Sequence, residues 1–104
     1  MIRYSRDSQN DLREIVDYTV DRCGEAQAVL YLDSLFECFD GLEHMPGMGR
    51  ACLDIYPALY RIEQGQHVIF YLPESEGIFI CRVLHKRMLI EYGEFQSSFS
   101  ESIE

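Results

Sequence analysis

Long apolar runs, paired cysteines and basic side chains are all scarce in this sequence. No stretch of about 18 or more apolar residues is present, as a membrane-spanning helix requires, and the first residues lack the apolar core of a secretory signal. We therefore expect a cytoplasmic protein without a membrane segment. With 104 residues, 47% of them hydrophobic, the chain has the size and composition of one folded domain, and we predict a single domain over residues 1–104.

The cysteines show neither a metal-binding nor a disulfide pattern. The four of them form no CxxC pair, and the three histidines add no zinc-binding spacing. Their neighbours are apolar, so in a reducing compartment we interpret them as small buried hydrophobic side chains. We accordingly expect no metal site and no cofactor. The four residues are Cys23, Cys38, Cys52 and Cys81.

Basic residues are few, and they are unevenly distributed. Nine Lys and Arg stand against eighteen Asp and Glu, which gives a net charge of −9. Residues 7–43 contain ten acidic and two basic side chains, whereas residues 50–88 contain four acidic and five basic ones. Such acidity argues against an extended contact with phosphates, so we expect no direct sequence-specific binding of nucleic acid. Any contact made by basic groups belongs to the second half of the chain.

Apolar residues at steps of three and four predict two helices in the first half. Residues 8–11 resemble a capping box and predict the start of the first helix, which Gly24 can end. The second helix starts almost at once, and so short a link implies an antiparallel hairpin. The first apolar stripe contains Leu12, Ile15, Val16, Thr19, Val20 and Cys23, and the second contains Ala28, Leu32, Leu35, Phe39 and Leu42, with Val29 and Phe36 alongside.

Strand patterns flank this predicted hairpin. Ile2 and Tyr4 alternate with polar residues and indicate a short opening strand. After a Pro- and Gly-containing break at residues 45–50, β-rich runs at 59–63, 67–72 and 78–85 are separated by turns, which predicts a meander of two hairpins. We therefore predict an α+β fold in which an N-terminal strand precedes a two-helix antiparallel hairpin packed on a small antiparallel sheet. A short acidic tail, residues 88–104, follows.

The order of these parts is more specific than any one of them. After the two helices and the glycine-bearing turn come an Arg, then His-x-Ile-x-Tyr, then Arg-x-Leu-His-x-x-Met. In this order the chain resembles the ParE toxins of the ParE/RelE superfamily, over about residues 4–88. The matching positions are Asp11, Leu12, Ile15, Tyr18, Gly24, Ala28, Tyr31, Leu35, Leu42, Pro46, Gly49, Arg50, Arg61, residues 67–71, Ile78, residues 82–85 and Met88.

The resemblance implies the toxin of a type II toxin–antitoxin system, whose family target is bacterial DNA gyrase. It also implies a ParD-like antitoxin that lays a helix and an extended segment over the toxin. A partner helix can fill an apolar groove, and an extended segment can add to an open sheet edge. On this basis the expected antitoxin contacts are Leu12, Ile15, Tyr18 and Tyr31 on the two helices. The acidic helical face would favour a basic antitoxin segment.

The expected contacts with the target lie where the last strand ends. They are Arg82, His85, Lys86, Arg87 and Met88. Arg82 interrupts an apolar strand, so it is either held by a carboxylate in a structural ion pair or exposed as a binding group. His85 is either hydrogen-bonded to backbone at the strand end or in contact with the target.

RelE, the sister branch, is similar in fold but cleaves messenger RNA on the ribosome. Cleavage needs proton carriers and cations near one phosphate, and the candidates here are Arg61, His67, Arg82 and His85. Against this hypothesis stand the single lysine and the lack of a His–Tyr ending. His67 and Tyr71 share a strand face, where a core role is the commoner one for Tyr. We therefore predict a binder that is not an enzyme, with the ribonuclease as one alternative and a non-toxic, antitoxin-binding homologue as another.

Overall fold

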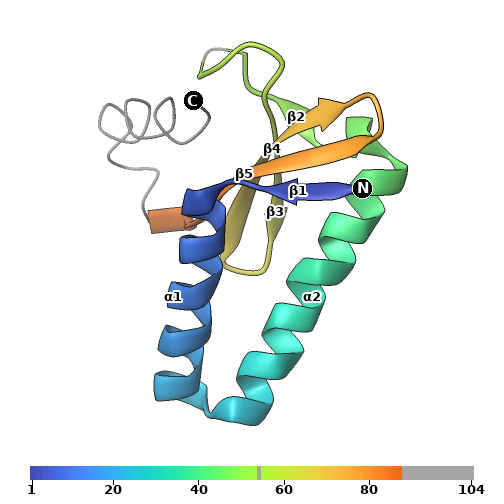
Figure 1. The fold of residues 1–104 in the computed structure, drawn as a ribbon. Coiled ribbons are helices and arrows are strands. Elements are labelled where there is room, and N and C mark those ends of the chain that lie inside the picture. The colour runs from blue at the N-terminus through green and yellow to red at the C-terminus, as the bar shows by residue number, and fades with distance from the viewer. Residues whose placement is uncertain (54, 88–104) are drawn as a thin grey trace.

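Two helices pack against a five-stranded mixed sheet that begins with the N-terminal strand (Figure 1). The computed structural model describes residues 1–53 and 55–87. In chain order the elements are β1 (Ile2–Tyr4), α1 (Arg6–Cys23), α2 (Glu25–His44), the 3-10 turn η1 (Pro46–Met48), β2 (Arg50–Ala51), β3 (Tyr60–Gln64), β4 (His67–Glu74) and β5 (Gly77–His85). The predicted α+β class is confirmed. The predicted acidic tail lies outside the described residues.

Helix α1 begins earlier than the sequence predicted. Its N-cap is Ser5, whose Oγ accepts a hydrogen bond from the Ser8 backbone N–H at 2.9 Å. Ser8, the predicted cap, instead lies inside the first turn and donates its hydroxyl to the Ser5 carbonyl at 2.9 Å. Both serines are buried against the sheet. The pattern therefore contained two possible caps, and the packing of the first turn on β5 decided between them.

Gly24 alone links the two helices. It ends α1 with its N–H donated to the Val20 carbonyl at 2.9 Å, and it is also the residue before α2. Its φ of 89° lies in the region that favours glycine. The predicted stop at Gly24 and the antiparallel hairpin are thus confirmed.

The sheet order is β1-β5-β4-β3-β2, and the predicted meander forms its centre. β1 departs from the predicted antiparallel arrangement, because it runs parallel to β5 with Ile2 opposite Ile78. Alternation in a sequence indicates which face of a strand is apolar but not which strand it pairs with. No hairpin connects β1 to β5, so the direction of β1 is set only by contacts between the two ends of the chain.

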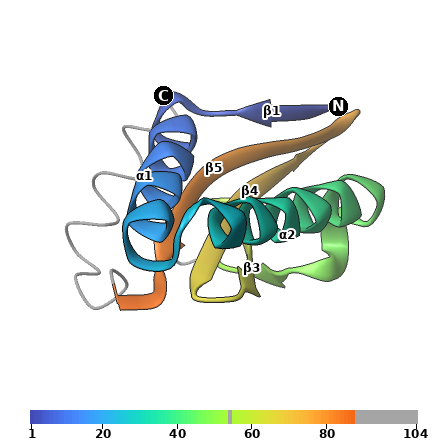
Figure 2. The same ribbon diagram turned by 90° about the horizontal axis from the view of Figure 1, so that it is seen from below.

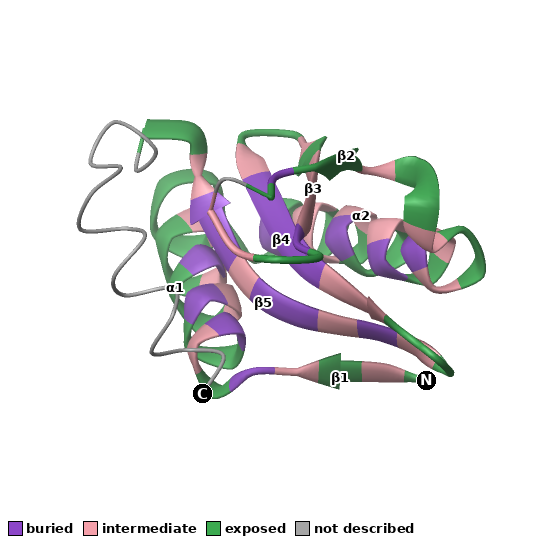
Figure 3. Cartoon of the chain, turned by 90° about the horizontal axis from the view of Figure 1, so that it is seen from above, coloured by how far each residue is buried: buried purple, intermediate pink, exposed green. Residues whose placement is uncertain are grey.

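The two faces of the sheet support two apolar clusters, and the buried residues of its strands lie on β4 and β5 (Figure 3). Between helices and sheet lie Ile15, Leu35, Phe39, Leu42, Ile69, Tyr71, Ile78, Ile80 and Val83. On the other face lie Cys52, Leu59, Val68, Phe70, Cys81 and Leu84. Each such large apolar side chain contributes about 1.5–3 kcal/mol by leaving water. This core fixes β4 and β5, on which the site described below is built.

The Gly24 end of the helical hairpin projects past the sheet (Figure 1), and in the view from below it lies nearest the viewer (Figure 2). Four members of the predicted apolar stripes are exposed: Val20, Cys23 and Val29 near this end, and Phe36, which follows the fully buried Leu35 on α2. Cys23 corrects the prediction of buried cysteines, which holds for Cys52 and Cys81. Burial raises the pKa of the Cys81 thiol to about 12, so this thiol stays protonated and unreactive. Within the described residues, neither helix is long and apolar enough to span a bilayer.

Candidate functional site

A groove of about 370 Å³ lies between α1 and the end of β5. Its lining consists of Asp11, Glu14, Ile15, Tyr18 and Thr19 from α1, together with His67, Val83, His85 and Arg87. The α1 residues follow helical spacing, so they form one face of that helix. The groove brings together two sets of residues that the sequence had predicted separately, the antitoxin contacts Ile15 and Tyr18 and the target contacts His85 and Arg87.

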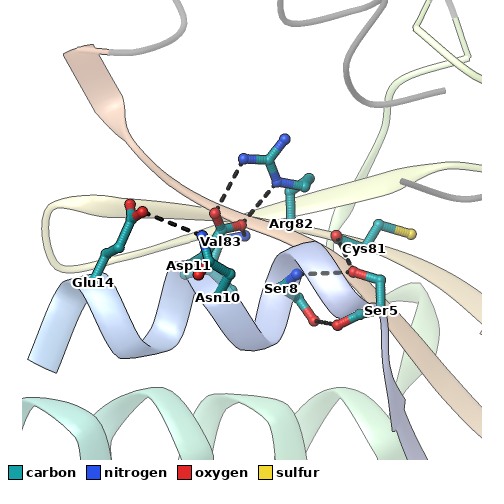
Figure 4. Close-up of polar contacts among 8 residues, drawn as sticks. All are labelled: Ser5, Ser8, Asn10, Asp11, Glu14, Cys81, Arg82 and Val83. Carbon is teal, nitrogen blue, oxygen red and sulfur yellow. Dashed lines mark hydrogen bonds and ion pairs between the residues drawn. The ribbon is translucent and has the colours of Figure 1, made fainter. Parts of the chain in front are cut away.

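The wall between α1 and β5 is held by an ion pair, shown in Figure 4. Arg82 donates through Nε to Asp11 Oδ2 at 2.8 Å and through Nη2 to Asp11 Oδ1 at 3.0 Å. The Val83 backbone N–H donates to the same carboxylate at 2.9 Å. The side chains of Arg82 and Asp11 are only 13% and 7% exposed. Of the two alternatives for Arg82, the geometry is that of the structural ion pair.

The electrostatics of this pair are consistent with a fully charged arginine. Burial lowers the pKa of Arg82, but its hydrogen bonds to Asp11 and the charge of that carboxylate raise it, with a net rise above the ordinary value. A guanidinium that forms a two-pronged contact of this kind is held in one orientation. Arg82 therefore positions α1 on β5, and its role in the groove is to hold the wall in place.

Polar groups of α1 and its cap also close the edge of β5 beyond the short strand β1. The Ser5 N–H donates to the Ile80 carbonyl at 3.0 Å, and Ser5 Oγ donates to the Cys81 carbonyl at 2.6 Å. The Asp11 carboxylate then accepts a hydrogen bond from the Val83 N–H. An extended partner segment consequently cannot add to β5 along this stretch. The edges that remain at the two sides of the sheet belong to β1 and β2.

His67 and His85 face each other at one end of the groove. Their rings make an edge-to-face contact with centroids 5.3 Å apart, as expected from their pairing across β4 and β5. Burial, and secondarily the charge of His85, lowers the pKa of His67 to about 4, so His67 is neutral near pH 7. His85 Nδ1 accepts a hydrogen bond from the Arg87 N–H at 3.1 Å. This matches the backbone-bonded alternative for His85, although the residue still lines the groove.

Tyr31 ties α2 to the β3–β4 turn. Its Oη accepts from the Gln66 N–H at 3.1 Å, lies 3.3 Å from the Gln64 carbonyl and is 2.5 Å from His67 Nδ1. Burial raises the pKa of this phenol, which stays protonated. Because His67 is neutral, its Nδ1 can accept a hydrogen bond from the Tyr31 hydroxyl. Tyr31 is thus engaged within the fold, and it does not line the groove.

The remaining predicted contact residues differ in exposure. Leu12 is partly buried and packs against the core, whereas Tyr18 is 57% exposed with Arg22 stacked 4.9 Å from its ring centroid. Lys86, which follows β5, forms an ion pair with Glu63 of β3 at 3.4 Å. Met88 lies outside the described residues. Sequence reasoning missed Asp11, Glu14, Thr19 and Val83 as lining residues, although the first three share the helical spacing of Ile15 and Tyr18.

The four ribonuclease candidates do not converge on one point. His67 and His85 line the groove, Arg82 is held by Asp11, and Arg61 lines a different hollow beside β2. Tyr71 is fully buried, as expected of a core residue, with its hydroxyl donated to the Pro46 carbonyl at 2.7 Å. Among the described residues, no cluster of three or more His, Cys, Asp or Glu side chains is arranged to hold a metal ion.

Comparison with known proteins gives consistent results. Residues 2–90 match the model of a family described as the ParE toxin of type II toxin-antitoxin system, parDE. The chain is 41% identical over 85 residues to Toxin ParE1 of Mycobacterium tuberculosis, which covers 81% of this chain and 87% of that protein. It is 30% identical over 83 residues to Toxin ParE of Escherichia coli, which covers 79% of this chain and 81% of that protein.

A solved structure extends the likeness to the fold. A chain of the chromosomal ParDE TA system from P. aeruginosa matches with a TM-score of 0.68 at 19% identity, over 81% of this chain and 92% of that chain. This match shows that the fold of the chain, a two-helix hairpin on a small mixed sheet, is shared with a solved structure. The chain belongs to the ParE toxin family of type II toxin–antitoxin systems, as its sequence pattern predicted.

Proposed function

We propose that an antitoxin neutralises this toxin by covering α1 and filling the groove between α1 and β5, and that the free toxin inhibits DNA gyrase. The groove is the observation that carries the proposal. Its walls include the side chains of Ile15, Thr19 and Val83, and it opens beside the exposed ring of Tyr18. An amphipathic partner helix binds such a surface through side chains at helical spacing.

Charge supports a basic partner segment. Glu14 borders the groove, and Asp17 and Asp21 are exposed farther along the same helix. Opposite charge on a partner raises the rate of encounter, and this effect weakens as salt screens it. A basic, amphipathic antitoxin segment therefore matches both the shape and the charge of this surface. We propose a cytoplasmic location on the same grounds, since gyrase and such an antitoxin are expected there.

The far wall of the groove supplies the surface that we assign to the target. Lys86 is 42% exposed and Arg87 is exposed, while His85 lines the groove between them and α1. Exposed side chains that follow a rigid strand are well placed for recognition. An antitoxin seated in the groove would cover part of this wall as well. Neutralisation would then follow from direct obstruction of the target contact.

Binding, without catalysis, is the mode of action that we propose. RNA cleavage would require proton carriers and cations around one phosphate. His67 and His85 lie together in the groove, but Arg61 lines another hollow and Arg82 is held by Asp11. The experiment uses the purified toxin without antitoxin. It should inhibit supercoiling by gyrase and leave ribosome-bound messenger RNA intact. Cleaved RNA beside normal supercoiling would favour the RelE-type activity, whereas tight antitoxin binding with neither effect would identify a non-toxic homologue.

The groove itself is tested with Tyr18. Replacement of Tyr18 by Ala should weaken binding of the cognate antitoxin by about 10- to 100-fold, because large exposed aromatic residues dominate interface energies. Calorimetric titration measures the change. The matched control is Val29→Ala, since Val29 is 59% exposed but lies on α2, outside the groove. Equal affinity for the Tyr18 variant and the unmodified protein would remove the groove from the antitoxin interface.

A further inference from the structure

A second hollow, of about 400 Å³, lies at the β2–β3 edge of the sheet and is lined by Met48, Gly49, Arg50, Arg61, Ile62 and Glu63. Arg50 lies directly opposite Arg61 in the antiparallel β2–β3 pair. Residues opposite each other in such a pair project to the same face, with their Cβ atoms about 5 Å apart. Two arginine side chains therefore border one hollow.

The backbone beside this pair is tightly fixed. The Gly49 N–H donates to the Tyr71 hydroxyl at 3.0 Å, and that hydroxyl is itself held by Pro46. A Cβ at Gly49 would lie 2.7 Å from the Arg61 carbonyl oxygen, a distance that real Cβ atoms do not reach. Because glycine allows the two backbones to approach this closely, Arg50 is held in register with Arg61.

The two like charges lack an internal partner within residues 1–53 and 55–87. No ion pair joins Arg50 or Arg61 to a carboxylate in this part of the chain, and Glu63, the acid at the hollow, lies 3.4 Å from Lys86. Like charges directly opposite each other destabilise a strand pair. The pair therefore opposes folding slightly, and an external anion would relieve the repulsion.

We propose that Arg50 and Arg61 form a binding site for a phosphate monoester. Such a group carries a charge of about −1.5 to −2 at pH 7 and three acceptor oxygens, so one compact ligand can neutralise both guanidinium groups and accept hydrogen bonds from each. A lone carboxylate or a single phosphodiester carries about one negative charge and therefore leaves about one of the two positive charges unneutralised. The net charge of −9 further disfavours a long polyanion.

Two sources supply this chemistry, a nucleotide and a phosphorylated side chain of a protein. Both are tested by calorimetric titration of the full chain at an ionic strength of about 0.01 M, where exposed charges are weakly screened. The probes are inorganic phosphate, adenosine 5′-monophosphate, a phosphoserine peptide and an oligothymidylate without a terminal phosphate. We expect the monoester probes to bind, and tighter binding of the mononucleotide or of the phosphopeptide identifies the source.

The variants separate a site from a structural role. Arg50→Gln and Arg61→Gln should each weaken monoester binding about tenfold or more. The affinity of Arg61→Lys should lie between those of the unmodified protein and Arg61→Gln, because lysine keeps the charge but loses the two-pronged contact. Melting temperatures should stay equal or rise, since a repulsion is removed. Arg13→Gln, on the exposed side of α1, is the matched control and should change neither quantity.

Three results would overturn the site. The first is the absence of binding by every monoester probe, and the second is binding that persists unchanged when both arginines are replaced. The third is tighter binding of the oligothymidylate with the same dependence on Arg50 and Arg61, which would identify a surface for nucleic-acid backbone. None of these results bears on the α1–β5 groove, because that groove shares no residue with this hollow.

Discussion

The sheet ends differently on its two sides. On the β5 side, Ser5 and Asp11 satisfy the edge beyond β1 with hydrogen bonds and an ion pair. On the β2 side, the outermost strand is two residues long, and arginines oppose each other. The first side is a closed wall beside an apolar groove, and the second is an open edge with unbalanced positive charge. The net charge of the chain therefore describes neither surface, because it sums the charges of an acidic surface and of a locally basic one.

The largest expected effect comes from opening the closed side. Asp11→Ala leaves the Arg82 guanidinium and the Val83 N–H without their shared carboxylate, and removal of one member of a buried pair costs about 3–5 kcal/mol. Urea unfolding followed by circular dichroism measures the loss. The double variant Asp11→Ala, Arg82→Met should be more stable than Asp11→Ala alone. If Asp11→Ala alone retained full stability, the ion pair would not hold α1 on β5.

A smaller effect is expected where the open side is anchored. Gly49→Ala forces a Cβ against the Arg61 carbonyl and the Tyr71 hydroxyl, and overpacking of this kind costs about 1–3 kcal/mol. Gly47→Ala is the matched control, because a Cβ there meets no atom within 4 Å. Thermal unfolding of the two variants measures the contrast. Equal melting temperatures would show that the β2 edge is loosely held.

The smallest expected effect is a pH dependence at the closed side. His67 has a folded pKa of about 4, below its ordinary 6.5, so between these values the unfolded chain binds more protons. Stability is therefore complete above pH 6.5 and falls as the pH decreases toward 4. The loss is about 1 kcal/mol once screening at this half-exposed side chain is allowed for.

The pH effect is measured as the difference in urea midpoint between pH 7 and pH 4.5. Carboxylates also titrate in this range, so the comparison is with His67→Gln, in which the part due to this imidazole should vanish. Tyr31 should also affect this difference in urea midpoint, since its hydroxyl is hydrogen-bonded to His67 Nδ1. An identical pH difference in the His67 variant and the unmodified protein would contradict the assignment.

Much of the framework was predictable because it depends on local patterns. Gly24 ends one helix and begins the next as its position indicated, and the central strands follow their β-rich runs. What was not predictable depends on distant partners. The parallel direction of β1, the choice of Ser5 as cap and the commitment of Arg82 to Asp11 are all set by packing between the two ends of the chain.

The site was predictable only in pieces. Tyr18 and His85 were expected to contact different partners, and nothing in their spacing indicated that they border one groove. Tyr31, also expected among the antitoxin contacts, does not line the groove, and its hydroxyl holds the β3–β4 turn. The opposition of Arg50 and Arg61 was also invisible in the sequence, because a strand of two residues leaves no periodic pattern.

The neighbouring positions of β1 and β5 have a consequence for how the chain acquires its shape. Ser5 and Cys81, which bond at this junction, are 76 positions apart. Closing so long a loop carries an entropic cost, and contacts of high sequence separation slow folding. During synthesis the first strand has no neighbour until the last one leaves the ribosome. We therefore expect the fold to be completed late in synthesis, and nascent chains lacking β5 would lack the wall that both partners are proposed to use.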